Sequence, residues 1–466
     1  MRIDPALTIK DLAPAVERTF TLAAAKVRAI ERTWDPARGT PVFTVDGVWT
    51  TRGWTEWTQG FQYGCALLAF DGTGDKKLLE LGRKQTVERM SAHVTHIGVH
   101  DHGFNNLSTY GNLRRLMREG KIARNDWELA YYEMAIRASA CVQAARWSER
   151  REKDGSAGGY VYSFNGPHSL FVDTIRTVRI LGLAHQLGHQ FQGEGDAKIS
   201  LLGRAVTHGL TTGRWNITYG EGRDTYDVRG RTAHEAIFNR NDGAFRCPSS
   251  QQGYAPFSTW TRGLAWAVVG FAEELEFLDA LPAADFAAAG LAPKKDILAS
   301  FRRTAEAVSD FWIDRATASD GIPYWDTGAP ELHRLGDWQS RPADPYNVHE
   351  PVDSSAAAIA AQGLIRLGRW LNAQRGGAAL AKRYTQAGLT AAKTLLAEPY
   401  LSVSPKHQGL LLHSVYHRPN GWDHIPAGAK VPNGESSMWG DYHGLELALL
   451  LQRLANKGDY PTFFDA

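Results

Sequence analysis

The chain has 466 residues, of which 43% are hydrophobic and 22% charged, and its formal net charge at pH 7 is +2. These proportions are ordinary for globular proteins and exclude a disordered or collagen-like chain. Because binding to phosphate backbones needs a strongly basic surface, the balanced charge also disfavours a nucleic-acid partner. The length allows roughly three domains of average size or one large helical ring.

Three features predict a protein of a reducing compartment, the cytoplasm. The N-terminal segment lacks the basic stretch and apolar core of a signal peptide. No uninterrupted apolar run reaches the roughly 20 residues of a membrane span, so we expect no membrane partner. The cysteines Cys65, Cys141 and Cys247 are too few and too scattered for a disulfide framework.

Apolar residues recur with helical spacing along most of the chain. The predicted long helices span 8–34, 77–93, 125–147, 169–188, 197–213, 257–280, 294–315, 353–372, 379–397 and 440–455, with shorter ones near 60–70 and 107–118. Short strands are predicted at Val42–Val45, Tyr160–Phe164 and Trp215–Tyr219. Loops rich in Gly, Pro and Asp join the helices.

About twelve helices without an intervening linker predict six helical hairpins in one domain over residues 1–466. Closed into a ring, the hairpins form an all-α (α/α)6 barrel in which the ends of the inner helices line one cleft. An open solenoid is the alternative architecture. Solenoids usually show a sequence period, and none is visible here.

Several familiar catalytic signatures are missing from the sequence. It contains no GxGxxG motif after a strand, no phosphate-binding loop and no GxSxG elbow. His185 and His189 form an HxxxH pair, but Gln186 stands where a zinc protease has its glutamate. We therefore predict no metal and no cofactor.

Asp101 is bracketed by His100 and His102 just before the predicted 107–118 helix. An N-terminal cap would explain an acid at this point but not the two histidines, so a functional site is favoured. Together with His96 the histidines could hold zinc, but a polar loop is the preferred interpretation.

Asp173 is predicted one turn into the 169–188 helix, beside Phe171 and Ile175. Partial removal from water would raise its pKa and suit it for general acid–base chemistry near neutral pH. The alternative is a structural acid that stabilises the helix start or pairs with Arg176. This segment by itself leaves both possibilities open.

Gln252, Trp260 and Trp266 lie in a third informative segment. Amide side chains form paired hydrogen bonds with hydroxyl groups, and indole faces cover the C–H patches of sugars. Trp266 is expected to face inward, on the side of Gly263 and Gly270, and core packing is an equally weighted alternative for this residue.

Seven segments, in this order, resemble glycoside hydrolase family 88, the unsaturated glucuronyl hydrolases. They are WTEWTQGF (54–61), HDHGF (100–104), the helix bearing Asp173, QGY…STWTRGLAWAVVGF (252–271), PYWD (323–326), DSSAAAIAAQGL (353–364) and LLLHS (410–414). The resemblance extends from about Trp54 to Leu450 and implies an (α/α)6-barrel hydrolase that needs no metal or cofactor.

The family acts on the 4,5-unsaturated uronic acid that polysaccharide lyases leave at the non-reducing end of oligosaccharides. An acid protonates C4, water attacks C5, and the resulting hemiketal opens and expels the aglycone. The resemblance implies that Asp173 is this acid/base and that Asp101 modulates the proton transfer. The residues expected to contact the substrate are Trp57, His100, Arg176, His234, Gln252, Trp260, Arg262 and Trp266. We expect an oligosaccharide as partner and a monomer or homodimer.

Some positions depart from the family pattern. Arg176 and Thr177 stand where members often have Met-Asn, and Leu264 replaces a common glutamine. The Gly and Lys associated with sulfated glycosaminoglycans are not evident after Ser414, and the loop over 331–352 looks enlarged. These departures disfavour a dedicated glycosaminoglycan substrate. The alternatives are a glycosidase of saturated glucuronides that uses an Asp101/Asp173 pair, a sugar isomerase or epimerase, and a non-catalytic carbohydrate-binding ring.

Overall fold

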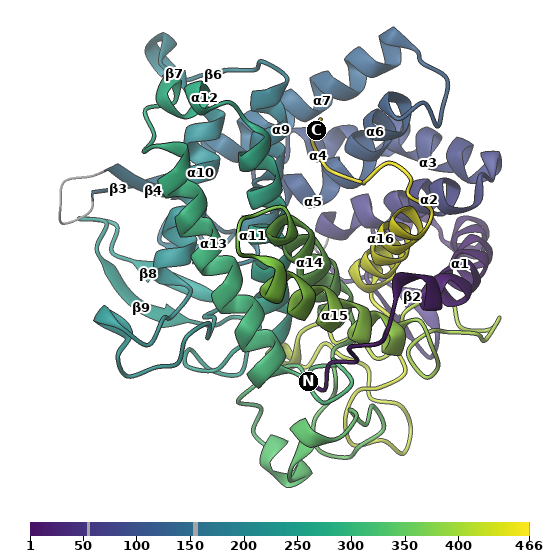
Figure 1. Cartoon of the computed structure of the whole chain (residues 1–466). Coiled ribbons are helices and arrows are strands. Elements are labelled where there is room, and N and C mark those ends of the chain that lie inside the picture. The colour runs from purple at the N-terminus through teal and green to yellow at the C-terminus, as the bar shows by residue number, and fades with distance from the viewer. Residues whose placement is uncertain (54–55, 152–156, 466) are drawn as a thin grey trace.

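Helices alternate along the chain between an outer and an inner ring (Figure 1). The structure, a computed structural model, describes residues 1–53, 56–151 and 157–465. The outer helices are α1 (Ala13–Thr33), α3 (Lys76–Arg89), α7 (Asp126–Ala145), α10 (Leu201–Trp215), α13 (Lys294–Phe311) and α15 (Ala378–Leu395). The inner helices are α2 (Gln59–Thr73), α5 (His102–Asn106) with α6 (Asn112–Arg118), α8 (Thr174–Thr177) with α9 (Arg179–Gln186), α11 (Thr261–Ala280), α14 (Ser354–Asn372) and α16 (Met438–Ala455).

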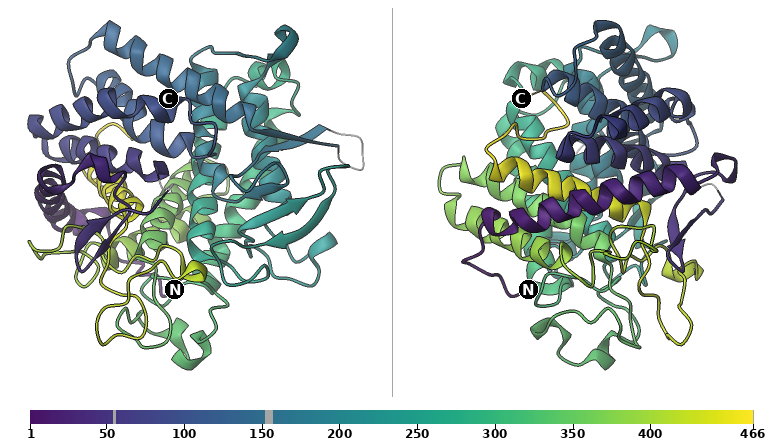
Figure 2. Two further views of the ribbon diagram at one scale, coloured as in Figure 1. Left: turned by 180° about the vertical axis from the view of Figure 1, so that it is seen from behind. Right: turned by 90° about the vertical axis from the view of Figure 1, so that its right-hand side faces the viewer.

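The inner ring closes because its last helix packs against its first. Each inner helix contacts the next one along the chain, and α16 contacts α2. Helices α1 and α16, from opposite ends of the sequence, also lie side by side (Figure 2). The predicted (α/α)6 barrel is therefore confirmed, and the open solenoid is excluded.

Small residues allow the inner helices to approach closely. Helix α14 is rich in alanine, and a Cβ atom added at its Gly363 would lie 2.6 Å from the Val269 Cα atom of α11. Real Cβ atoms do not come that close, so only glycine fits this crossing. The outer helices α10, α13 and α15 instead bury one face and expose the other, as amphipathic helices do.

The loops carry four small antiparallel sheets. They pair β1 (Phe43–Val45) with β2 (Val48–Thr50), β3 (Trp147–Arg151) with β4 (Ala157–Val161), β6 (Phe191–Gln192) with β7 (Lys198–Ile199), and β5 (Ser169–Phe171) through β8 (Glu235–Phe238) to β9 (Phe245–Ser249). The strand predicted at 42–45 is therefore present as β1, and the one predicted at 160–164 is shifted toward the N-terminus as β4. The strand predicted at 215–219 is wrong, because Trp215 ends α10 and Ile217 makes only an isolated bridge.

The prediction of one helix over 169–188 is also wrong. Residues 169–171 form β5, and the helical part is divided into α8 and α9. A short apolar run fits a buried strand as well as a helix, and here pairing with β8 decides the outcome. Asp173 is therefore the N-cap of α8 and does not lie one turn inside a helix.

The remaining helix boundaries lie within a few residues of their predicted positions, with local interruptions. The 77–93 helix divides into α3 and α4 (Ser91–Val94), and the 107–118 helix begins earlier, at α5, and includes a π-helical turn over Leu107–Gly111. Along the described chain, no helix has both the length and the apolar character needed to cross a membrane.

Candidate active site

A cavity of about 650 Å³ opens where α2, α5, α8 and α11 begin. Eight residues predicted from the sequence line it: Trp57, His100, Asp101, Asp173, Gln252, Trp260, Arg262 and Trp266. Trp54 and Thr55, which begin the motif containing Trp57, lie outside the described residues. Backbone N–H groups and the helix dipole make helix N-termini favourable for anions, so this end of the barrel suits a carboxylate ligand.

Two buried aspartates in the cavity occupy helix N-cap positions without capping the helix. Neither the Asp101 nor the Asp173 side chain accepts a hydrogen bond from the first turn of its helix. The His100 Nε2 atom lies 3.2 Å from the Asp173 Oδ1 atom and donates to it. Both carboxyl groups are thus placed at a helix start and kept available for other chemistry.

The charges of His100, Asp101 and Asp173 are coupled. Burial raises the pKa of Asp101, and the nearby Asp173 carboxylate raises it further, while His100 opposes the change. Burial also acts to raise the pKa of Asp173, but the hydrogen bond and charge of His100 outweigh it and hold that pKa below its usual value. Burial acts to lower the pKa of His100, yet the two carboxylates leave it raised.

The expected upward pKa shift is therefore wrong for Asp173 and falls on Asp101 instead. The sequence showed the apolar neighbours of Asp173 but not the imidazole that the fold places against it. In the folded chain, these pKa shifts favour a proton on the His100 ring rather than on the Asp173 carboxyl group.

Aromatic side chains form the wall and floor of the cavity. Trp57 stacks on Trp439 of α16, with ring centroids 5.1 Å apart. Trp266 packs against Phe104 with centroids 4.7 Å apart and is only 2% exposed. Trp266 is therefore both a core residue and part of the cavity lining, and its contact with a sugar stays a prediction.

Arg262 organises one side of the cavity. Its guanidinium lies between the rings of Trp260 and Trp439, 4.7 Å from each centroid. It donates to the Asp353 carboxylate at 3.2 Å and to the Gln252 side-chain oxygen at 3.0 Å. Since Gln252 also lines the cavity, Arg262 fixes the orientation of its amide.

His234 lies behind the cavity wall. Its Nδ1 atom accepts backbone hydrogen bonds from Gln251 at 3.0 Å and from Gln252 at 3.3 Å. The proton of the neutral ring is therefore on Nε2, which is buried and has no hydrogen-bond partner among the described residues. Burial lowers the pKa of His234 to about 4, so the ring is neutral at physiological pH.

Arg176 does not reach the cavity, so the expectation that it contacts the substrate is not met. Its side chain is fully buried below Trp266 and forms ion pairs with Glu273 at 3.0 Å and Glu446 at 2.7 Å. It also contacts His443. The sequence placed Arg176 close to Asp173 but could not show that the two side chains diverge.

Sequence reasoning missed seven of the lining residues: Val99, Phe104, Phe164, Gln251, Tyr416, His417 and Trp422. Three of them belong to the segment 416–422, which follows the recognised LLLHS motif and returns to the cavity over the start of α16. The high aromatic content of that segment was the available signal.

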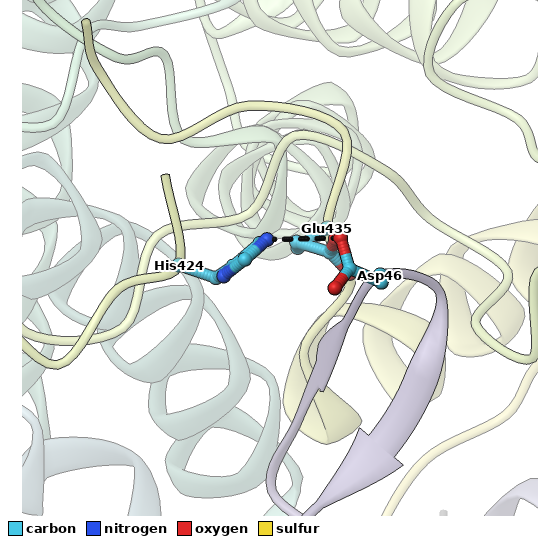
Figure 3. Close-up of side chains that lie close together, drawn as sticks. All are labelled: Asp46, His424 and Glu435. Carbon is cyan, nitrogen blue, oxygen red and sulfur yellow. Dashed lines mark hydrogen bonds and ion pairs between the residues drawn. The ribbon is translucent and has the colours of Figure 1, made fainter. Parts of the chain in front are cut away.

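The histidines considered as metal ligands have other partners. His185 pairs with Asp285 at 3.4 Å, and His189 contacts the Cys141 sulfur at 3.1 Å. Within the described residues, one group has the composition and spacing of a metal site: Asp46, His424 and Glu435 (Figure 3). None of these three lines the cavity.

Comparison with known proteins gives a consistent picture, although the sequence matches no family model. An unsaturated glucuronyl hydrolase of Formosa agariphila is 24% identical over 86% of this chain and 81% of its own length. An enzyme of the same name from Bacillus sp. strain GL1 is 26% identical over 86% of this chain and 87% of its own length. A crystal structure of an unsaturated glucuronyl hydrolase specific for heparin superposes with a TM-score of 0.70 at 20% identity, covering 96% of this chain and all of that one. With relatives aligned over most of its length and the barrel fold in common, the chain is similar to the unsaturated glucuronyl hydrolases in both sequence and fold.

Proposed function

We propose that this chain removes a 4,5-unsaturated uronic acid from the non-reducing end of lyase-generated oligosaccharides by adding water across the C4=C5 bond. The main observation is the pair of buried, non-capping aspartates coupled through His100 inside an aromatic cavity. The two sequence relatives described above are unsaturated glucuronyl hydrolases, which supports the same reaction.

Asp173 is the proposed proton donor to C4. In the free protein the proton rests on His100, which donates to Asp173. A bound uronate brings a second negative charge close to Asp173, which raises the pKa of that carboxyl and draws the proton onto it. Transfer to C4 leaves positive charge shared between C5 and the ring oxygen.

Water then attacks C5, and the regenerated Asp173 carboxylate accepts the proton that the water loses. The product is a hemiketal at C5. The bond between C5 and the ring oxygen breaks, so that C5 becomes a ketone and C1 a hemiacetal. The hemiacetal then collapses to an aldehyde at C1 and releases the aglycone as an alcohol. Asp101 lies next to His100, and its charge helps to raise the pKa of that ring, so Asp101 is proposed to modulate the proton transfer.

The rest of the cavity is suited to hold the sugar. Trp57 and Trp266 offer ring faces to C–H patches, and the Gln252 amide, oriented by Arg262, can bond hydroxyl groups. Arg262 also places a positive charge near the position of the uronate. This arrangement binds and orients the substrate, while the His100–Asp173 pair supplies the chemistry.

Several narrower statements are also proposals. The departures near Ser414 and in the 331–352 loop favour an aglycone outside the glycosaminoglycans. Residues 1–466 act as one catalytic domain. Cytoplasmic location, a monomer or homodimer, and the absence of a catalytic metal or cofactor stay predictions.

The test is a panel of oligosaccharides produced by several polysaccharide lyases. We expect the ultraviolet absorbance of the C4=C5–carboxylate group to disappear with at least one member of the panel, and Asp173→Asn to abolish the loss. A band that persists across the panel, together with release of sugar from saturated glucuronides, would instead identify a glycosidase that acts on saturated glucuronides.

A further inference from the structure

Three potential metal ligands converge at the surface, away from the cavity. Asp46 lies at the turn between β1 and β2, while His424 and Glu435 lie on the segment that leads into α16 (Figure 3). The nearest donor atoms of all three lie within 4.8 Å of one another. His424 Nε2 is 3.2 Å from Asp46 Oδ1. The three residues are distant in sequence, so no motif could have revealed the group.

The fold anchors Glu435 firmly. Its Oε2 atom accepts hydrogen bonds from the Thr44 hydroxyl and, at 3.3 Å, from the Gly47 backbone N–H. The His407 ring lies 3.6 Å from the same oxygen. Among the described residues all three of these contacts involve Oε2, which leaves Oε1 for a ligand.

Asp46 is the adjustable member of the group. Its side chain is 80% exposed, and its backbone has a φ of 50°, which keeps it at the tip of the hairpin. Ligands of tetrahedral zinc at about 2.1 Å from the metal lie about 3.4 Å from one another. The His424–Asp46 spacing already matches this value, and side-chain rotation of Asp46 can close the remaining gap.

We propose that Asp46, His424 and Glu435 bind a divalent transition-metal ion, with Zn²⁺ as the best match. One imidazole and two carboxylates are typical zinc ligands, whereas Ca²⁺ and Mg²⁺ prefer oxygen atoms alone. Water completes the coordination on the exposed side. The group combines two carboxylates with one imidazole, a mixed set of oxygen and nitrogen donors that suits a transition-metal dication.

The site has a structural consequence for the cavity. The segment that carries His424 also carries His417 and Trp422, both of which line the cavity. Arg52, which follows β2, already donates to the Trp422 backbone carbonyl at 2.8 Å. A bound ion would add a second link between the hairpin and this segment, and so stabilise the cavity mouth without taking part in the reaction.

The experiment is calorimetric titration of the full-length, chelator-treated protein with ZnCl₂, with MnCl₂ and CaCl₂ in parallel. We expect one equivalent of Zn²⁺ to bind, Ca²⁺ to bind at least tenfold more weakly, and the thermal midpoint to rise with Zn²⁺. Asp46→Asn and His424→Gln should each weaken Zn²⁺ at least tenfold. Asn is well tolerated at a positive φ, so Asp46→Asn is expected to fold normally.

His349→Gln is the matched control. His349 also pairs with a carboxylate, Glu331 at 3.3 Å, but belongs to no three-ligand group within the described chain. This variant should bind Zn²⁺ like the wild type. The proposal is overturned if the wild type shows no saturable Zn²⁺ binding, or if Asp46→Asn and His424→Gln bind with wild-type affinity.

Discussion

Two of the buried polar regions that the structure describes lie on either side of Trp266, and they differ in how their charges are paired. On the cavity side, Asp101 and Asp173 share one histidine and have shifted pKa values. On the other side, Arg176 is matched by Glu273 and Glu446. Burial alone therefore does not make a reactive group. Buried carboxylates that pair with arginine stabilise the fold, whereas carboxyl groups without an arginine partner are available for proton transfer.

Helix N-caps show the same contrast on a smaller scale. Asp353 begins α14, accepts hydrogen bonds from the Ser355 and Ala356 backbone N–H groups, and pairs with Arg262. Asp173 begins α8 and accepts no capping bond. The same residue type at the same helix position is thus structural in one case and proposed to be catalytic in the other.

Replacing each aspartate by asparagine should produce opposite phenotypes. Asp173→Asn should lose roughly 10²–10⁴-fold or more in kcat, because it removes the proton donor, while its thermal midpoint stays near that of the wild type. Asp353→Asn keeps a good capping group but leaves Arg262 buried without its carboxylate, so its main effect should be a lower midpoint. Steady-state kinetics and thermal unfolding of both variants would measure these effects. Equal losses of activity in the two variants would contradict the proposed difference between a catalytic Asp173 and a structural Asp353.

Arg176→Met tests the ion pairs that Arg176 forms with Glu273 and Glu446. It leaves two buried glutamates with less positive charge, so we expect the free energy of unfolding to fall by about 3–5 kcal/mol. Urea unfolding measures the change. Arg334→Met, in an exposed pair with Glu331, is the control and should change stability little. A stable Arg176→Met protein with a raised KM would instead restore the role of Arg176 in substrate contact.

Glu274 differs from the ion-paired glutamates around Arg176, because burial raises its pKa to about 8 and the charge of Glu273 raises it further. A carboxyl group with a raised folded-state pKa stabilises the fold fully below its unfolded value of 4.5, and this contribution is lost as pH rises toward 8. Glu274→Gln should therefore increase the free energy of unfolding by about 3 kcal/mol at pH 7 and by less than about 1 kcal/mol at pH 5. Urea titrations at the two pH values test this; a gain independent of pH would show that Glu274 does not titrate.

His100 gives the smallest of the expected effects. Because its pKa is raised, deprotonation above neutral pH should remove the proton that Asp173 needs, and kcat/KM should fall on the alkaline side. His100→Gln should eliminate this alkaline decline and lower kcat/KM by about tenfold at pH 6.5. Stability should change with pH in the same direction as activity. A histidine with a raised pKa stabilises the fold at low pH, and this stabilisation is lost as pH rises. If His100→Gln keeps the pH profile of the wild type, the proton needed by Asp173 is not held on His100.

The fold and most of the candidate site could be predicted from the sequence. Helical periodicity gave the helices and their number, and the motifs around Asp101, Asp173 and Trp260 identified residues that the structure brings to one cavity. Local pattern could not give the strand at Ser169–Phe171, because that strand exists only through pairing with β8, more than 60 residues away.

What the sequence by itself determined is therefore the barrel architecture, together with the positions of the two aspartates that the fold brings to one cavity. Helix spacing and motif order are local properties, and they can be read along the chain. The tertiary structure decided the direction in which the pKa of each aspartate shifts, since that of Asp173 is lowered by His100 lying 3.2 Å away. It also directed Arg176 away from the cavity toward Glu273 and Glu446. Burial and electrostatic pairing depend on residues that are far apart in sequence, and only the closed barrel brings them together.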